Sequence, residues 1–494
     1  MSPSISELMR AIPEEDDREQ GSAVPCPRVP NQRTTQADEG RGHVTPALGA
    51  AALRPVPIGR WRRLRLLSTL QAKIASAYLF HWIRGWFRKA DENERLLAET
   101  HWKNAWALLD AMGYLRGAVI KIGQTLANFP DIVPREFVET LEKLHFDAPP
   151  MHWSLLREMV TNELGDDPEH LFASFEKRAF AAASLGQVHA GRLKSGDEVA
   201  VKIQYPGIAR TIREDFRNLF LFLLPGRLGK DWANTKDQFD DLRMRVEAET
   251  DYRAEAATLA RVRTLFRDED GIAVPRVFAQ YSTARVLTME RLGGVHLDEF
   301  LAGNPSQEVR DAFARKIVRA WYRMLFVARL TYADVHPGNL LFMNDGRLGL
   351  IDFGFMLAHS DEEWAQIRMM DRALTTGLRE DRIASVKAWS SITDDLADAD
   401  RLRLCEEFAD WCWRCRYWGG PFDFGDEADF RRGIDLFTEM VRKRYSRSRP
   451  STPVIARQNF GLRSILYRLK AKIDIRPIAE EEIKVTGWDR SAYT

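Results

Sequence analysis

The spacing of hydrophobic and polar residues changes several times along the chain. Residues 1–59 are rich in Pro, Gly, Ser, Thr and charged residues without a sustained period, which predicts a disordered tail. Within residues 60–170, the stretch from Trp102 to Phe129 has few helix breakers other than Gly, and we expect an N-terminal helical extension. Two short β runs, 187–193 and 198–204, flank the turn Lys194-Ser195-Gly196-Asp197, which predicts a hairpin.

The remaining chain mixes both kinds of pattern. Helical spacing runs from about 208 to 267, and two strand-like stretches follow around 273–278 and 284–289. After residue 292 the chain is mainly helical, with one hairpin between Leu340 and Ile351 that turns at Asn344-Asp345-Gly346. The alternation of patterns predicts an α+β fold.

Composition and charge narrow the class of protein. The 494 residues suggest about three units at roughly 150 residues each. With 45% hydrophobic residues, the chain has ample material for a core. The 72 Lys and Arg residues balance 71 Asp and Glu residues, so no basic field points to nucleic acid as a partner.

The same data bear on the compartment. Only four cysteines occur, which excludes a disulfide framework and favours a reducing environment. No segment reaches the ~18 apolar residues of a membrane-spanning helix. The N-terminal stretch is polar and carries four acidic residues at positions 14–17, which argues against a signal or transit peptide. We therefore expect a cytoplasmic protein.

A basic segment leaves two interpretations open. Residues 41–90 contain no Asp or Glu, and within 60–90 eight Lys and Arg residues alternate with aromatic and aliphatic ones. A basic, aromatic-rich amphipathic helix suits the surface of an anionic membrane, which would make the protein peripheral there. A helix docked on the protein with a solvated basic face explains the same pattern.

Candidate chemistry begins at Lys202. Alternation places Val199, Val201 and Ile203 on one face of its strand, and Lys202 with Ala200 on the other. A lysine among apolar residues costs free energy unless an anionic group pairs with it, although a solvated lysine on an edge strand would be the simpler interpretation of this strand alone. Just upstream lies a loop of small residues, through which the backbone could approach a polyphosphate: Ala181, Ala182, Ala183, Ser184 and Gly186.

A second group of polar residues surrounds the second hairpin. Asn339 and Asp352 stand at its two ends, almost equidistant from the turn, so strand pairing should bring them side by side. An amide oxygen beside a carboxylate suits Mg²⁺ held against phosphate oxygens. Asp334 precedes Asn339 by five residues, where it could orient or deprotonate a hydroxyl group.

These motifs occur in the order of a protein-kinase fold. The loop is Ala-rich where ordinary kinases have G-x-G-x-x-G, and no Ala-Pro-Glu follows Asp352-Phe353-Gly354. Upstream, residues 115–124 end in Lys121-Ile122-Gly123-Gln124. Together these features resemble the UbiB/ADCK (AarF-domain) family of atypical kinases, which is linked to ubiquinone and isoprenoid-lipid metabolism. The resemblance covers about residues 95–355, and the segment from Pro421-Phe422-Asp423-Phe424 to Lys472 is also similar.

The resemblance implies a bilobal protein-kinase-like fold, with the N-lobe at 171–291 and the C-lobe at 292–494. It implies that Lys202 contacts the α and β phosphates of ATP and pairs with Glu255, that Asn339 and Asp352 hold Mg²⁺, and that Asp334 is the catalytic-loop acid. Glu290 is a further candidate for nucleotide binding. The loop around Asp334 reads Tyr332-Ala333-Asp334-Val335-His336, where relatives usually have His-Ala-Asp-Pro-His.

Four further residues are implied to regulate the site. Lys121 and Gln124 share one face of a helix that folds over the active site in the family. Glu249 and Asp251 match the family's Glu-x-Asp pair, with Glu249 as a partner for Lys121. Helical geometry predicts separate tasks for these acidic residues, since Asp251 and Glu255 share a face at i, i+4 and Glu249 points about 120° away from Glu255.

The function expected from this resemblance is Mg²⁺-dependent ATP hydrolysis or phosphoryl transfer in quinone or isoprenoid-lipid metabolism, with a lipid or quinone precursor as a further ligand. The alternative is a non-catalytic, nucleotide-gated lipid-binding pseudokinase. An ordinary protein kinase would require the Lys121 helix to lie away from the cleft.

The remaining candidates are expected to be structural. The motif Cys412-Trp413-Arg414-Cys415 lacks the second ligand pair of a structural zinc site, so we expect packed thiols there, and we expect structural roles for His189 and His336.

Overall fold

The computed structural model describes residues 153–490 except 184, 224–235, 237–238, 241–242, 245, 333–334, 391–398 and 444–451. The predictions for the tail, for the basic segment 60–90 and for Lys121, Gln124, Ser184 and Asp334 therefore lie outside the described residues.

The N-lobe is built on one antiparallel sheet, in which the strands follow the order β1-β3-β4-β6 and β2 pairs with β3. The predicted hairpin is confirmed, and its turn includes Gly196 at a φ of +93°. The strands are β1 (Phe172–Phe175), β2 (Ala181–Ala183), β3 (Gly186–Leu193), β4 (Glu198–Gln204) and β6 (Val286–Glu290).

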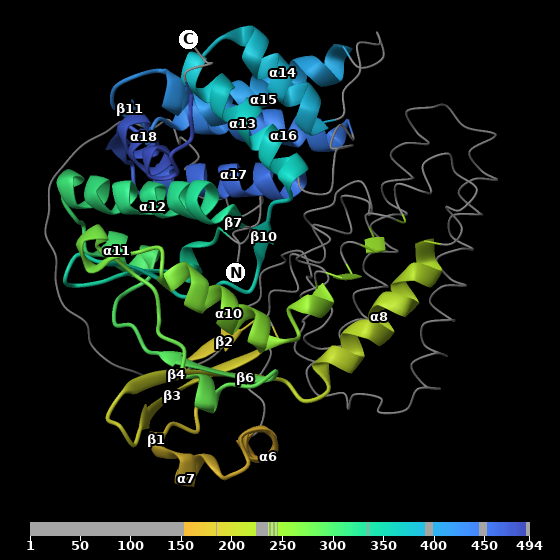
Figure 1. Ribbon diagram of the computed structural model, residues 1–494, viewed down its shortest axis with the longest axis vertical. Coiled ribbons are helices and arrows are strands. Elements are labelled where there is room, and N and C mark those ends of the chain that lie inside the picture. The colour runs from red at the N-terminus through yellow and green to blue at the C-terminus, as the bar shows by residue number, and fades with distance from the viewer. Residues whose placement is uncertain are drawn as a thin grey trace, which may run out of the picture.

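The two faces of β4 pack as the alternation predicted. Val199, Val201 and Ile203 are fully buried in a cluster with residues of α6 (Trp153–Leu164), which α7 (Pro168–Leu171) follows. Ala200 lies in a different cluster on the opposite face, together with Tyr252 of α10 (Tyr252–Arg263). Figure 1 shows α10 between this sheet and the helices of the C-lobe. The face that carries Lys202 is therefore the face turned toward α10.

One of two expectations for residues 208–278 is confirmed and the other is wrong. The helical pattern from 208 to 267 is confirmed by α8 (Ile208–Leu223) and α10, with residues 249–250 forming a turn before α10. The stretch 273–278 is not one strand: β5 (Ile272–Ala273) pairs in parallel with a C-lobe strand, and Val277 forms an isolated bridge to Met289. Short 3₁₀ turns η3 (Asp268–Asp270) and η4 (Ala279–Tyr281) flank these pieces.

The C-lobe begins with α11 (Leu297–Ala302) and the long helix α12 (Gln307–Ala328). The predicted hairpin is present as β8 (Leu340–Phe342) and β9 (Leu348–Leu350). Two further strand pairs were not predicted, because two or three residues are too few to display a period of two. They are β7 (Leu330–Tyr332) with β10 (Met356–Ala358), and β11 (Phe422–Asp423) with β12 (Lys472–Ile473).

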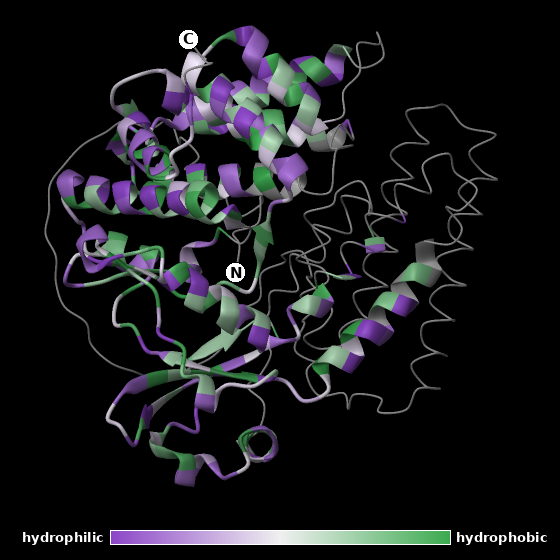
Figure 2. Cartoon of the chain, viewed as in Figure 1, coloured by the Kyte–Doolittle hydropathy of each residue, from purple (hydrophilic) through white to green (hydrophobic). Residues whose placement is uncertain are grey.

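The other helices of the C-lobe lie on the side of α12 away from the sheet, with α17 and α18 next to α12. They are α13 (Asp361–Thr376), α14 (Arg379–Ser390), α15 (Ala399–Tyr417), α16 (Glu427–Arg442), α17 (Thr452–Arg468) and α18 (Arg476–Val485). Figure 2 shows hydrophilic and hydrophobic residues alternating along them, as expected of helices that bury one face. Among the described residues, none of the helices has the length and hydrophobicity needed to cross a membrane.

Candidate functional site

Lys202 is buried and paired with two carboxylates. Its side chain is 8% exposed, and its Nζ donates hydrogen bonds to both carboxylate oxygens of Glu255, at 2.8 and 2.9 Å. The same Nζ lies 3.4 Å from Oδ2 of Asp352. The predicted pairing with Glu255 is confirmed, and three residues that are distant in the sequence meet at one amine.

The electrostatics of this group keep the lysine charged. Burial alone would lower the pKa of Lys202, but the carboxylates of Asp352 and Glu255 outweigh it and raise that pKa well above its ordinary value. Burial raises the pKa of Glu255, while the ammonium of Lys202 opposes this shift. The ring of Tyr252 adds a cation–π contact, with Nζ 5.1 Å from its centroid. Lys202 therefore presents a positive charge to the site.

Glu255 is positioned by the start of α10. Asp251 is the N-cap residue of this helix, and its side chain accepts a hydrogen bond from Arg253 N. Tyr252 N donates to Ala284 O at 2.9 Å, which ties the first turn to the segment just before β6. Glu255 lies in that first turn, with its side chain 5% exposed.

The helical geometry expected for the three acidic residues is therefore wrong. The helix begins at Tyr252, so Asp251 is a cap and Glu249 lies in the preceding turn, off the helix. The charge of Glu249 nevertheless acts on the site, since it adds to the rise in the pKa of Glu255. The regulatory roles of Glu249 and Asp251 stay predictions.

Asp352 is held by one backbone amide and by one side-chain hydroxyl. Its Oδ1 accepts a hydrogen bond from Gly354 N at 2.9 Å, and its own carbonyl accepts one from the hydroxyl of Tyr332 at 2.7 Å. A Cβ at Gly354 would lie 3.2 Å from Oδ1 of Asp352, so a side chain there would crowd the carboxylate. The side chain of Asp352 is 38% exposed and remains accessible to a ligand.

Asn339 ends the 3₁₀ turn η5 (Pro337–Asn339) and comes directly before β8. The register pairs Leu340 with Leu350, and Ile351 N donates to Asn339 O at 3.2 Å. Asn339 therefore lies opposite Ile351 across the hairpin, and Asp352 is the next residue along the chain. The backbones of the two predicted metal ligands run close together, and the meeting of their side chains stays a prediction.

The donor set fits a magnesium ion bound with a nucleotide. A carboxylate and an amide oxygen are hard ligands, and Mg²⁺ usually takes one or two protein ligands together with water and phosphate oxygens. Asp352 is accessible and fixed in position by Gly354 N. Within the described ranges, no group of three or more His, Cys, Asp and Glu side chains is arranged to hold a metal without such additional ligands.

The small-residue segment differs from expectation. Ala181, Ala182 and Ala183 form the strand β2 instead of a loop, because they pair with Val188, Gln187 and Gly186 in a tight hairpin. Gly186 has a packing reason to be glycine, since a Cβ there would lie 2.0 Å from the carbonyl oxygen of Ile203. Nucleotide binding by this hairpin stays a prediction.

Glu290 contacts other protein groups. Its carboxylate accepts a hydrogen bond from Arg276 N at 3.1 Å and lies 3.7 Å from the guanidinium of Arg263. These contacts fix the end of β6, and they give the side chain a structural role. Nucleotide binding by Glu290 stays a prediction.

Comparison with known proteins identifies the family. Residues 143–382 match the ABC1 atypical kinase-like domain. Over 389 residues the chain is 31% identical to the atypical kinase COQ8B, mitochondrial, of Rattus norvegicus, an alignment that covers 76% of this chain and 71% of that protein. The chain belongs to the ABC1 atypical kinase family. This confirms the resemblance to UbiB/ADCK proteins, and membership in a family of kinase-like domains implies nucleotide binding.

Two further comparisons support the assignment. The chain is 33% identical over 245 residues to the atypical kinase COQ8, mitochondrial, of Saccharomyces cerevisiae, which covers 49% of this chain and 48% of that protein. A solved structure of the Rv3197–erythromycin complex from Mycobacterium tuberculosis is 26% identical, with a TM-score of 0.51 over 81% of this chain and all of that chain. The α+β kinase-like fold is thereby confirmed.

Within the ABC1 domain, two site residues were not predicted. Tyr332 stands where the resemblance implies histidine, and its hydroxyl donates a hydrogen bond to the carbonyl of Asp352. The unexpected tyrosine at this position was visible in the sequence, but the sequence could not show that its hydroxyl would bond to the carbonyl of Asp352. Tyr252 gave no signal, because its contact with Lys202 depends on where α10 begins.

The weaker candidates are structural, as expected. His189 is fully buried, and its ring nitrogens contact Glu176 O and the amide nitrogen of Gln187. His336 caps η5 by accepting a hydrogen bond from Gly338 N at 2.9 Å. Cys412 and Cys415 are buried thiols, and burial raises the pKa of both.

Proposed function

We propose that the chain is a Mg-ATP-dependent atypical kinase of the UbiB type, which hydrolyses ATP or transfers its terminal phosphoryl group. The observation that carries this proposal is the buried Lys202, held by both oxygens of Glu255 and 3.4 Å from Asp352. A buried, charged lysine beside an accessible carboxylate is the arrangement that binds phosphate oxygens in kinases. A purely structural ion pair would not need the third, exposed partner.

Each residue has a distinct task in this proposal. Lys202 binds the α and β phosphates, and Glu255 fixes the direction of its amine. Asn339 and Asp352 would hold Mg²⁺, which when bound neutralises charge on the phosphates. Asp334 would orient or deprotonate the accepting hydroxyl group or water. Gly354 N and the hydroxyl of Tyr332 keep Asp352 in place throughout.

The test separates binding from turnover. Asp352→Asn should reduce Mg-ATP turnover by about 10²-fold or more, since it removes a charged ligand for the metal. Asp345→Asn is the matched control, because Asp345 lies at the turn of the same hairpin, half-exposed and paired with Arg347. Equal turnover by wild type and Asp352→Asn would refute the proposal. Nucleotide binding without turnover under any lipid condition would instead favour the pseudokinase.

The cellular role is proposed from the family. We propose that the activity serves quinone or other isoprenoid-lipid metabolism, with a lipid or quinone precursor as the acceptor or activator. We expect little phosphorylation of other proteins, because the Lys121 helix would occupy the space that a peptide substrate needs. Turnover measured against quinone-precursor mimics and generic protein substrates tests this. Robust phosphorylation of the proteins would contradict it.

Location is a separate proposal. We propose a cytoplasmic protein with peripheral membrane contact through the basic residues 60–90. The rat and yeast relatives are named as mitochondrial proteins. Deleting residues 1–90 should reduce co-sedimentation with anionic liposomes, and unchanged binding would exclude this contact.

A further inference from the structure

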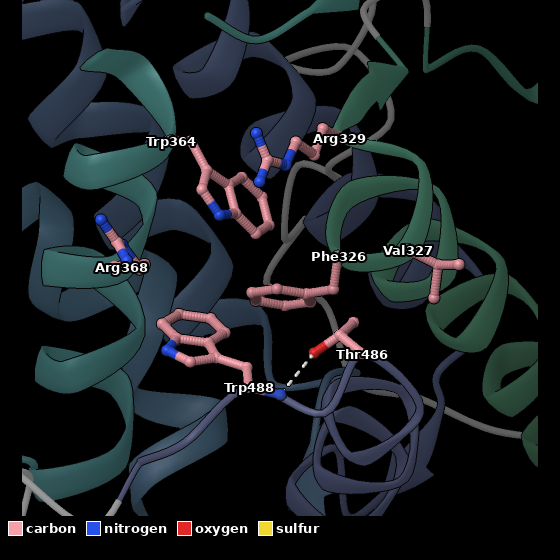
Figure 3. A pocket seen from close by; sticks show the side chains of 7 residues that line it. All are labelled: Phe326, Val327, Arg329, Trp364, Arg368, Thr486 and Trp488. Carbon is pink, nitrogen blue, oxygen red and sulfur yellow. Dashed lines mark hydrogen bonds between the residues drawn. The ribbon is translucent and has the colours of Figure 1, made fainter. Parts of the chain in front are cut away.

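A partly open pocket lies in the C-lobe, formed by residues that are absent from the group around Lys202. Its volume is about 380 Å³, which is within the range of small-molecule sites. It is lined by Phe326, Val327, Arg329, Trp364, Arg368, Thr486 and Trp488. Figure 3 shows these side chains coming from the end of α12, from α13 and from the segment after α18.

Three aromatic rings form the apolar wall of this pocket. The ring centroids of Phe326, Trp364 and Trp488 lie 5.9 to 6.2 Å from one another. Phe326 is buried at the base, whereas both tryptophans are half-buried and keep part of their indole surface accessible. A planar ring placed against them would bury that surface and gain from aromatic stacking.

The wall that carries Trp488 is anchored at both ends. Before it, the hydroxyl of Thr486 donates to Ile483 O at 2.6 Å and accepts a hydrogen bond from Trp488 N at 3.2 Å. After it, Arg490 lies 3.1 Å from the fully buried carboxylate of Asp371 on α13. Because this wall is held before any ligand arrives, binding would not need to order it.

Arg329 brings charge to the pocket at a cost in backbone energy. It adopts a left-handed conformation with a φ of +51°, which costs a residue with a Cβ roughly 1 kcal/mol. Its guanidinium lies 4.9 Å from the centroid of Trp364 and pairs with Asp361, whose side chain is 97% exposed. An exposed ion pair of this kind is weak, so Arg329 can exchange that partner for a ligand.

The charges select between two kinds of aromatic ligand. A cage of aromatic rings alone would favour an organic cation. Here the lining residues include two arginines, Arg329 and Arg368, and no acidic residue, and Asp361 lies beside the pocket as the partner of Arg329. We propose that the pocket binds a planar aromatic molecule that carries an anionic group, with the ring against Trp364 and Trp488 and the anion at Arg329.

The experiment uses the full chain, and the probe is naphthalene-2-carboxylate. Binding is measured by calorimetry at saturating Mg-ADP, so that the nucleotide site is already filled. Arg329→Gly should weaken binding by about tenfold or more, because it removes the guanidinium. Glycine adopts the left-handed conformation without strain, so this variant should melt no lower than wild type. Arg403→Gln is the matched control, since Arg403 is an exposed arginine of α15 outside the pocket. This variant should bind naphthalene-2-carboxylate as tightly as wild type does.

Two further arms keep the test decisive. Trp488→Leu should also weaken binding by about tenfold, and the uncharged analogue naphthalene-2-methanol should bind wild type by about tenfold less tightly. The proposal is overturned if Arg329→Gly and Trp488→Leu bind the carboxylate as wild type does, if wild type does not bind it at millimolar concentration, or if a trimethyl(aryl)ammonium probe binds more tightly.

Discussion

Replacing Lys202 by methionine should make the stability of the N-lobe fall as the pH rises. Met fills a similar volume but removes the ammonium that lowers the pKa of Glu255. Burial and the nearby charge of Asp352 would then act unopposed, so the pKa of Glu255 in the folded protein should rise further above its ordinary value of 4.5. A group whose pKa is raised by folding contributes stability that is present below the unfolded value and lost as the pH rises through the folded value.

The magnitude follows from the burial of the pair. Removing one partner of a buried ion pair costs about 3–5 kcal/mol. The side chains of Lys202 and Glu255 are 8% and 5% exposed, so little water can compensate.

The assay is urea unfolding between pH 4.5 and 8, followed by hydrogen exchange of peptides from β4 and α10. Lys202→Met with Glu255→Gln is the control, because the double variant has no buried carboxyl group left at this position to titrate. The single variant should match the double near pH 4.5 and be several kcal/mol less stable at pH 8. A difference between the two that does not grow with pH would show that Glu255 is not held as a buried partner of Lys202.

Two further substitutions test the frame around the site. Gly186→Ala should destabilise the N-lobe by about 1–3 kcal/mol or prevent its folding, because the new Cβ would overlap the backbone of β4, whereas Gly293→Ala, which meets nothing within 4 Å, should be neutral in thermal melts. Asp371→Asn should cost about 3–5 kcal/mol, since it leaves the buried Arg416 without its carboxylate partner at 2.6 Å, and the same change at the exposed Asp361 should shift the melting temperature little.

The parts of the site that the sequence predicted depend on short-range patterns. Alternation along β4 placed Lys202 on the face opposite Val199 and Val201, and the structure has it so. The Asn-Asp-Gly turn predicted the hairpin from 340 to 351. Both patterns lie within a few residues of the feature that they predict. The resemblance to a known family predicted the kinase-like fold that contains both features.

The parts that were missed depend on where elements begin and on tertiary packing. The alanine run has no side-chain period, so nothing in it distinguished a strand from a loop. The C-lobe pocket unites residues from Phe326 to Trp488, and no local pattern connects them.

The start of α10 shows how a family motif can have a structural meaning of its own. Asp251 belongs to the Glu-x-Asp pair for which the resemblance implies regulation, yet in the structure it caps the helix through Arg253 N. The cap decides that the helix begins at Tyr252, and this start places Glu255 in the first turn, where its carboxylate meets Lys202. A partner that pulled on Asp251 or Glu249 would therefore act on the end of the helix that positions Glu255. Regulation and the pairing of Lys202 with Glu255 would be linked through this cap, without direct contact between the regulator and the nucleotide.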